Sequence, residues 1–313
     1  MSDLGVFAAR YHRFVRVLEI VDRVCPAFAR NFVARWWGRL ASPYRLHAGK
    51  IIAAMQSGLG LSDRAALLAW RRWRESHGQF GLSIFAYPRW TPAILQQGLA
   101  TADLGVLRRA AATGGLLLTY HSHHHNSLPC LFGFAGARIS ALAGSEEDSP
   151  LFPVMGRYIH LINRGSALHF GGGDYLFSDK LRTLVKGVKA GLDGRGMVLV
   201  LCDFPAGKQV YELLGRRLAA PTGAISLALK QQVPIYTAIL YGGYGDQPVL
   251  RMRELERSGG TAGVVRQYLD FLVEIVRQAP AAWQGWDWFA DLPLFSSPAA
   301  NGVEIESEIP ERT

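Results

Sequence analysis

The chain has 313 residues, 49% hydrophobic and 19% charged, so it can bury a large core and is not an intrinsically disordered protein. Its 34 lysines and arginines against 25 acidic residues give a formal net charge of +9, which favours an anionic partner. The three cysteines are odd in number and far apart, which argues against a disulfide framework and indicates a reducing compartment.

The first fifty residues hold nine basic and three acidic side chains, a net charge of +6. From Leu4 to Val24 the apolar residues recur at helical spacing, with arginines on the other side. The Trp- and Arg-containing segment 35–39 follows, and both residue types suit a lipid headgroup region. Residues 1–95 are therefore predicted to be a basic helical region. It either contacts an anionic membrane surface or packs on the core with a solvated basic face.

No segment reaches the roughly 18 consecutive apolar residues of a spanning helix. Arginines interrupt the first thirty residues, where a signal peptide would be continuously apolar. The sequence therefore predicts a soluble or peripheral cytoplasmic protein, and we favour a membrane surface or an acidic carrier protein over nucleic acid as its partner.

Further along, helical stretches at 60–78 and 91–111 precede short apolar runs alternating with helices. Strands are predicted at 114–120, 138–143, 159–162, 197–202 and 233–241, with an edge strand at 249–253. Helices are predicted at 179–192, 221–231 and 263–278. This alternation predicts an α/β fold with a mixed, mainly parallel sheet flanked by helices, over a core of residues 96–290. Residues 291–313 are predicted to form a loose acidic tail.

The most unusual segment directly follows the first strand and reads Tyr120-His121-Ser122-His123-His124-His125-Asn126. Catalytic groups gather at the carboxyl ends of strands in α/β sheets, and histidine titrates near neutral pH. We favour His121 as a general base whose neighbours His123 and His125 line the cleft. A metal site and a merely structural loop stay open as alternatives, although the chain shows no further cluster of metal ligands.

Residues from about 55 to 290 resemble the lysophospholipid acyltransferase superfamily, in the branch that adds late acyl chains to lipid A and related glycolipids. The resemblance rests on several short segments in the same order along the chain. They are the histidine segment at the place of a His-x4-Glu/Asp motif, Arg157–Gly165, Met197–Asp203, Leu214–Lys230 with its Pro-Thr-Gly, Gln232–Ile235 and Pro280–Trp288. It implies the family's α/β fold, with acyl transfer as the activity.

The resemblance further implies a donor thioester on acyl carrier protein or coenzyme A and a lipid or glycolipid acceptor. No cofactor is needed. The reaction would take place at the cytoplasmic face of a bacterial inner membrane, with the protein bound peripherally.

The chain departs from the family at Asn126, which stands where the family has a carboxylate. In serine proteases, replacing the orienting Asp by Asn lowers turnover about 10⁴-fold. Three hypotheses follow. Asp203, at the end of another predicted strand, supplies the carboxylate; the acceptor is an amine, which needs less activation; or the site is weakened or repurposed. The amide of Asn126 remains a candidate donor to an oxyanion.

The predicted substrate-binding residues lie further along the chain. Arg157 and Arg164 are candidates for holding a phosphate or an acidic sugar, because a guanidinium binds such groups through two parallel hydrogen bonds. Thr222 and Gly223 are predicted to begin a helix, where exposed backbone N–H groups favour an anion. Solvated surface charge and ordinary helix capping are the simpler explanations of these two pairs.

Overall fold

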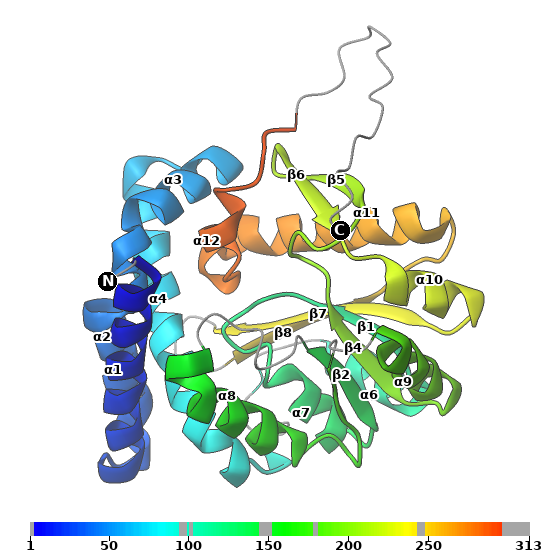
Figure 1. Ribbon diagram of the computed structural model, residues 1–313, viewed down its shortest axis with the longest axis horizontal. Helices are drawn as coiled ribbons and strands as arrows, with labels where there is room; N and C mark the ends of the chain where they lie inside the picture. Colours follow the sequence, from blue (N-terminus) through cyan, green and yellow to red (C-terminus); the bar gives the residue numbers. More distant parts are fainter. Residues whose placement is uncertain are drawn as a thin grey trace, which may run out of the picture.

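The computed structural model describes residues 3–93, 99, 103–143, 152–177, 181–242 and 248–295. Its centre is a six-stranded sheet with helices on both faces, and a layer of helices from the start of the chain stands at one side (Figure 1). The predicted α/β class with a mainly parallel mixed sheet is confirmed, and so is the N-terminal helical region.

The strand order in the sheet is β3-β2-β4-β1-β7-β8. All neighbouring pairs are parallel except β7 and β8, which are antiparallel. The strands are β1 (Gly115–Thr119), β2 (Ile139–Ala143), β3 (Asp174–Phe177), β4 (Met197–Leu201), β7 (Ile235–Gly242) and β8 (Pro248–Glu254). The central strand β1 is buried along its whole length, as expected for a parallel strand covered on both faces.

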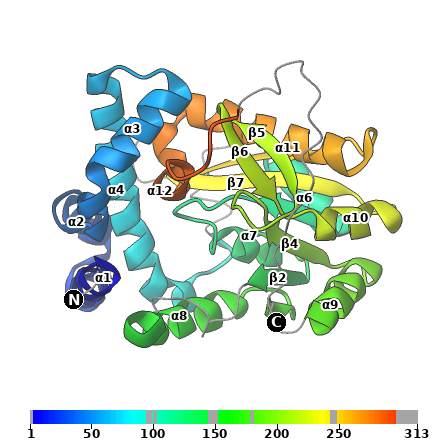
Figure 2. The same ribbon diagram turned by 45° about the horizontal axis from the view of Figure 1, so that its top comes forward.

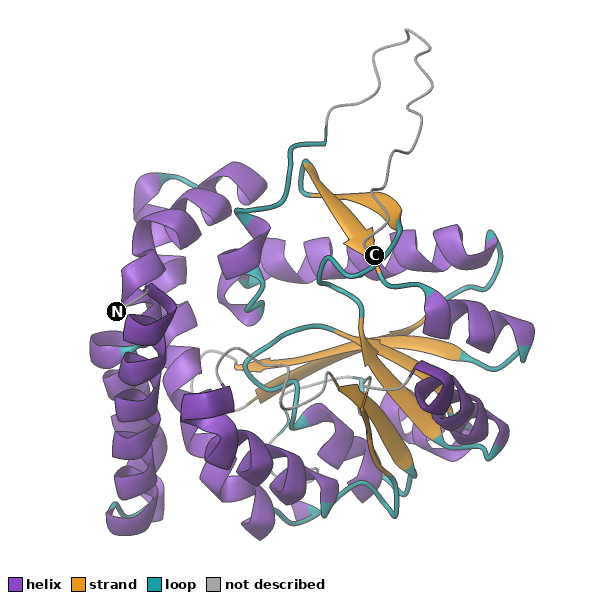
Figure 3. Ribbon diagram, in the orientation of Figure 1, coloured by secondary structure: helices purple, strands orange, loops and turns teal. Residues whose placement is uncertain are grey.

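Alternate residues of β1 face two separate apolar clusters. Leu116 and Leu118 face the cluster that contains α9 (Leu181–Asp193), α10 (Gly223–Lys230) and α11 (Gly260–Gln278). Leu117 faces the cluster built with α6 (Leu104–Thr113) and α7 (Leu128–Phe134). Figure 3, in the orientation of Figure 1, shows α11 above the strands and α7 below them. Because successive side chains of a strand point to opposite faces of the sheet, β1 contributes to two apolar cores, one on each face.

The N-terminal layer consists of α1 (Asp3–Val24), α2 (Ala27–Ala41), η1 (Pro43–His47), α3 (Ala48–Leu59) and α4 (Asp63–Ala86), and η2 (Tyr87–Arg89) follows it. Helices α2 and α4 cross at Ala34, Gly38 and Gly78. A Cβ at Gly78 would lie 1.9 Å from the carbonyl oxygen of Ala34, and one at Gly38 would lie 2.2 Å from that of Arg74. Only glycine allows this approach of the two backbones.

Two smaller units complete the fold near the carboxyl ends of β1 and β4. The hairpin of β5 (Gln209–Leu213) and β6 (Arg216–Ala220) follows β4, and the chain ends with η3 (Pro280–Ala282) and α12 (Trp286–Phe289). Figure 2 shows α12 between α3 and the β5–β6 hairpin. Three tryptophans of this end of the chain therefore lie near the catalytic candidates described below.

The predicted strand at 159–162 is wrong, because these residues lie inside helix α8 (Phe152–Ala167), which packs on α1 and α4. The predicted helix at 60–78 extends to Ala86, and of the stretch 91–111 the described helix α6 begins only at Leu104. Strand β3 and the β5–β6 hairpin were not predicted. Residues 296–313 of the predicted tail lie outside the described residues.

None of the described helices has the length and hydropathy needed to cross a membrane.

Candidate active site

The register of two parallel strands brings the two main candidate residues together. Thr119 of β1 pairs with Leu201 of β4, and each chain continues for two residues to His121 and Asp203. Because parallel neighbours in register stay side by side, these two residues leave the sheet at the same level. They are 82 positions apart in the sequence.

His121 is bonded to Asp203 through its ring and through its backbone. Its Nδ1 lies 2.8 Å from Oδ1 of Asp203, and its backbone N–H donates to Oδ2 at 2.9 Å. A carboxylate accepts, so Nδ1 carries the proton and Nε2 keeps a free lone pair. The side chain of His121 is 27% exposed, whereas that of Asp203 is fully buried. The ring of His121 is therefore oriented from inside by Asp203, and part of the His121 side chain is exposed.

Asp203 is held by further donors from the end of the chain. The indole Nε1 of Trp283 donates to Oδ2 at 2.7 Å, and that of Trp288 donates to the backbone oxygen of Asp203 at 3.3 Å. Burial alone would raise the pKa of Asp203, but the charge and hydrogen bonds of His121, with the indole of Trp283, bring it below its ordinary value. The carboxylate is therefore ionised at neutral pH and can stabilise an imidazolium.

The turn that carries His121 is anchored on both sides. The Ser122 hydroxyl donates to the Leu240 carbonyl of β7 at 2.6 Å, and the backbone of Ser122 bridges to Trp283. The backbone N–H of Gln284 donates to the carbonyl of His121 at 2.6 Å. This part of the turn is thus fixed by a strand and by the C-terminal segment.

The rings of the other histidines point in different directions. His125 donates from Nδ1 to the Ser122 carbonyl at 2.6 Å, and its ring centre lies 5.7 Å from that of His121. His123 is buried, and its ring contacts the rings of Trp73 and His77 of α4 edge-on. His125 thus adjoins His121, while His123 presents no surface to a substrate.

The aromatic surroundings of His121 also include Phe204 and Trp288, with ring centres at 5.6 and 5.0 Å. Both rings meet the imidazole edge-on. They limit water around the half-buried base, which strengthens its electrostatic coupling to Asp203.

Asn126 does not take the place of the carboxylate. Within the described part of the chain, the ring of His121 is hydrogen-bonded by Asp203 alone, and Asn126 makes a contact only through its backbone oxygen, with Cys130 Sγ at 3.5 Å. Thr222 and Gly223 begin α10 as predicted, and Thr222 makes no side-chain cap. No hydrogen bond or ring contact in the described residues joins them to His121 or Asp203.

The two predicted substrate-binding arginines lie on α8. Arg157 donates to Oε1 of Glu19 on α1 at 2.7 Å, which ties α8 to the N-terminal layer. Arg164, in the last turn of α8, is exposed. Neither residue contacts the His121–Asp203 pair, because the segment forms a helix beside the N-terminal layer where a strand had been predicted.

The described residues contain no group of three or more His, Cys, Asp or Glu side chains placed to hold a metal ion. The geometry explains this for the alternating histidines. The ring of His121 turns to Asp203, that of His123 turns into the core and that of His125 turns back to its own backbone.

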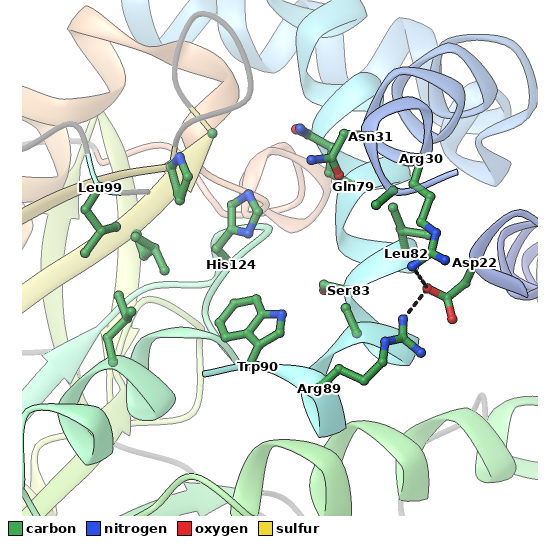
Figure 4. A pocket seen from close by; sticks show the side chains of 16 residues that line it. Asp22, Arg30, Asn31, Gln79, Leu82, Ser83, Arg89, Trp90, Leu99 and His124 are labelled. Carbon is green, nitrogen blue, oxygen red and sulfur yellow. Dashed lines mark hydrogen bonds and ion pairs between the residues drawn. The ribbon is translucent and has the colours of Figure 1, made fainter. Parts of the chain in front are cut away.

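One cavity adjoins the histidine turn, and a second lies beside the first. The first, of about 320 Å³, lies between α2, α4, η2 and β7, and Figure 4 shows His124 and Trp90 projecting into it, opposite Asp22 with Arg30 and Arg89. The second, of about 630 Å³, is lined by α4, β7 and residues 279–282, and its walls combine apolar side chains with charged ones such as Arg35, Arg72 and Glu75. The two share Gln79 and Gly242, and neither is lined by His121.

No protein-family model matches the chain, and no curated protein matches it either.

Sequence reasoning assigned no role to Trp283 and Trp288, although both stood in a segment that contributed to the resemblance. The sequence shows a cluster of aromatic residues in this segment, but such a cluster is equally typical of side chains that pack in the core. Their indole N–H groups reach Asp203 only because the C-terminal segment returns to the carboxyl ends of the strands.

Proposed function

We propose that the protein is an acyltransferase that moves an acyl group from a carrier thioester to a hydroxyl or amine of a lipid or glycolipid. The observation that carries this proposal is the buried carboxylate of Asp203 bonded to Nδ1 of His121. It supplies, from a neighbouring strand, the charge that Asn126 lacks. Of the three hypotheses drawn from the sequence, this geometry favours the first.

In the proposed mechanism, Nε2 of His121 accepts the proton of the acceptor as its oxygen or nitrogen forms a bond with the thioester carbonyl carbon. Asp203 stabilises the imidazolium, and backbone donors or the Asn126 amide stabilise the oxyanion. When the C–S bond breaks, the imidazolium returns its proton to the departing thiolate. The carrier leaves as a thiol, and the acyl group stays on the acceptor.

The proposed donor is acyl carrier protein or coenzyme A, because both present the acyl group as a phosphopantetheine thioester and the basic chain would attract either. The proposed location is the cytoplasmic face of a bacterial inner membrane. The cavity of about 630 Å³, whose walls are both apolar and charged, is in the range of sites that bury small ligands.

The proposal is tested with purified protein, radiolabelled acyl carrier protein and a bacterial lipid extract. We expect labelled lipid with the wild-type chain and a loss of at least about 10³-fold with His121→Ala. The matched control is His123→Ala, which removes a buried ring of the same turn. Full transfer by His121→Ala would overturn the assignment of His121 as the base. Failure to label any extract would replace the proposal by a lipid- or carrier-binding role without catalysis.

A further inference from the structure

A row of large apolar side chains lies exposed on the outer surface of α1 and α2. Its members recur every four residues, and we call them the outer stripe: Ile20, Val24, Phe28, Phe32, Trp36 and Leu40. Phe28 is 89% exposed, Phe32 72% and Trp36 53%. Rings of this size are rarely left in water by chance, and several of them exposed on one helix indicate an interaction surface.

The stripe faces outward because the opposite side of α2 is committed to α4. The small residues Ala34 and Gly38 allow the two backbones to meet, so the large residues of α2 occupy the remaining faces. Figure 1 shows α1 and α2 at the edge of the molecule, on the far side of α4 from α12. The exposed rings therefore follow from the helix crossing.

The surroundings of the stripe are basic. The sequence contains no acidic residue between Asp22 and Asp63, but six lysines and arginines. The nearby carboxylates each pair with two arginines: Glu19 with Arg23 and Arg157, Asp22 with Arg30 and Arg89, and Glu75 with Arg35 and Arg39. Each of these clusters therefore keeps an excess positive charge.

A surface hollow next to Leu40 extends this basic region. It has a volume of about 550 Å³, and Arg10, Arg13 and Arg45 line it together with Phe14 and Trp37. No carboxylate is among its lining residues. Guanidinium groups around an aromatic floor suit a phosphate group that is attached to an apolar body.

We propose that the outer stripe docks this protein on an anionic lipid bilayer, with Phe28, Phe32 and Trp36 inserted among the headgroups and the hollow holding lipid phosphate. This inference rests on the proposed function, because the outer stripe would be the surface through which a lipid acceptor reaches the protein. Helix α2 also lines the first cavity through Ala27, Arg30 and Asn31. Docking on this face therefore brings that cavity close to the bilayer surface.

The test is flotation of the full chain with vesicles of phosphatidylcholine alone or mixed with about half phosphatidylglycerol. We expect binding to the anionic vesicles, little to the neutral ones, and weaker binding in about 0.5 M salt, where charges are screened. The variant Phe28→Ser/Phe32→Ser/Trp36→Ser should bind at least about tenfold more weakly. The matched control, Leu168→Ser/Val210→Ser/Leu294→Ser, removes exposed apolar residues elsewhere and should bind like the wild-type chain.

The hollow is tested separately with Arg10→Gln/Arg13→Gln/Arg45→Gln, which should reduce anionic binding and flatten its dependence on salt. Wild-type behaviour of the stripe variant, or equal loss in the control variant, would overturn the proposal. So would a wild-type dimer that the stripe variant converts to a monomer without any vesicle binding. His121→Ala should float like the wild-type chain, so a failure of the acyl transfer proposal and a failure of docking give different results.

Discussion

Two histidines of one turn, His121 and His123, occupy opposite kinds of environment. His121 has a buried carboxylate on one ring nitrogen, and its side chain is partly exposed. His123 lies between Trp73 and His77, and its Nε2 has no hydrogen-bond partner, as is also true of both ring nitrogens of His77. The imidazole is the same in both places, and its neighbours decide whether it can exchange protons.

The two regions therefore respond differently to protons. Burial lowers the pKa of His77 to about 3 and holds the pKa of His123 well below its usual range, so both stay neutral near pH 7. The rings that surround His77 are Tyr11, Phe14, Tyr44, Trp73, Phe80 and His123, and no carboxylate of the described residues is hydrogen-bonded to either of its ring nitrogens. Only the site with Asp203 can stabilise a positive imidazole, and three experiments test this difference.

The largest effect is expected for Asp203→Asn. The shape of the side chain is kept, but the charge that orients and stabilises the His121 imidazolium is lost. We expect kcat for acyl transfer to fall about 10⁴-fold, as in the comparable serine-protease change, with KM nearly unchanged. Steady-state kinetics on a labelled thioester measures both constants.

The control for this variant is its thermal unfolding, which should remain cooperative, because Asn can still accept the N–H of Trp283. A kcat within about threefold of the wild-type value would show that Asp203 serves the fold alone, and His121 would then need another partner.

An intermediate effect is expected for the pH dependence of stability. The pKa of a buried histidine such as His77 is lower in the folded protein than in the unfolded chain, where it is about 6.5. Below about pH 6.5 the unfolded chain therefore binds more protons than the folded protein. Stability therefore falls as pH decreases from about 6.5 towards 3. For His77 this costs about 1.4 kcal/mol of unfolding free energy per pH unit in that window.

His77→Phe should flatten this decline, and urea unfolding at about pH 7 and pH 5.5 measures the difference. The control is Leu168→Ala, which changes an exposed residue without a titratable group and should leave the slope as it is. An unchanged slope in His77→Phe would mean that water or another proton acceptor reaches the buried pair.

The smallest effect is expected for Asn126→Ala. Within the described residues the Asn126 side chain makes no hydrogen bond to His121, so its removal should change kcat by less than about threefold. A loss of about 10²-fold or more would instead identify its amide as an oxyanion donor. The same kinetic assay distinguishes the two results.

The parts of the fold predicted correctly from sequence are those with strong apolar runs. β1, β4 and β7 are buried in the sheet and are rich in branched or bulky apolar residues, and the amphipathic pattern of α11 predicted a helix. The run at 159–162 was too short to distinguish a strand from a buried turn of helix, and its neighbours in α8 decided the outcome. β5 carries exposed polar residues, so no apolar signal existed there.

The candidate site was predictable where it depends on strand ends. His121 and Asp203 each follow a strand, and the carboxyl ends of parallel strands share one edge of the sheet. The direction of His123 could not be predicted, because it depends on Trp73 and His77 of α4, about fifty residues earlier in the chain. The contribution of Trp283 likewise depends on where the end of the chain returns.

The pairing of β1 with β4 has a consequence for protein engineering. Backbone hydrogen bonds between these strands hold His121 beside Asp203. The chain between the two strands passes through α7, β2, α8, β3 and α9, and none of these elements supplies either side chain. A circular permutation or an inserted reporter domain in that intervening stretch should therefore preserve the dyad, provided that both strands keep their register. Shifting one strand by a single residue would separate the two side chains, however conservative the substitutions that caused the shift.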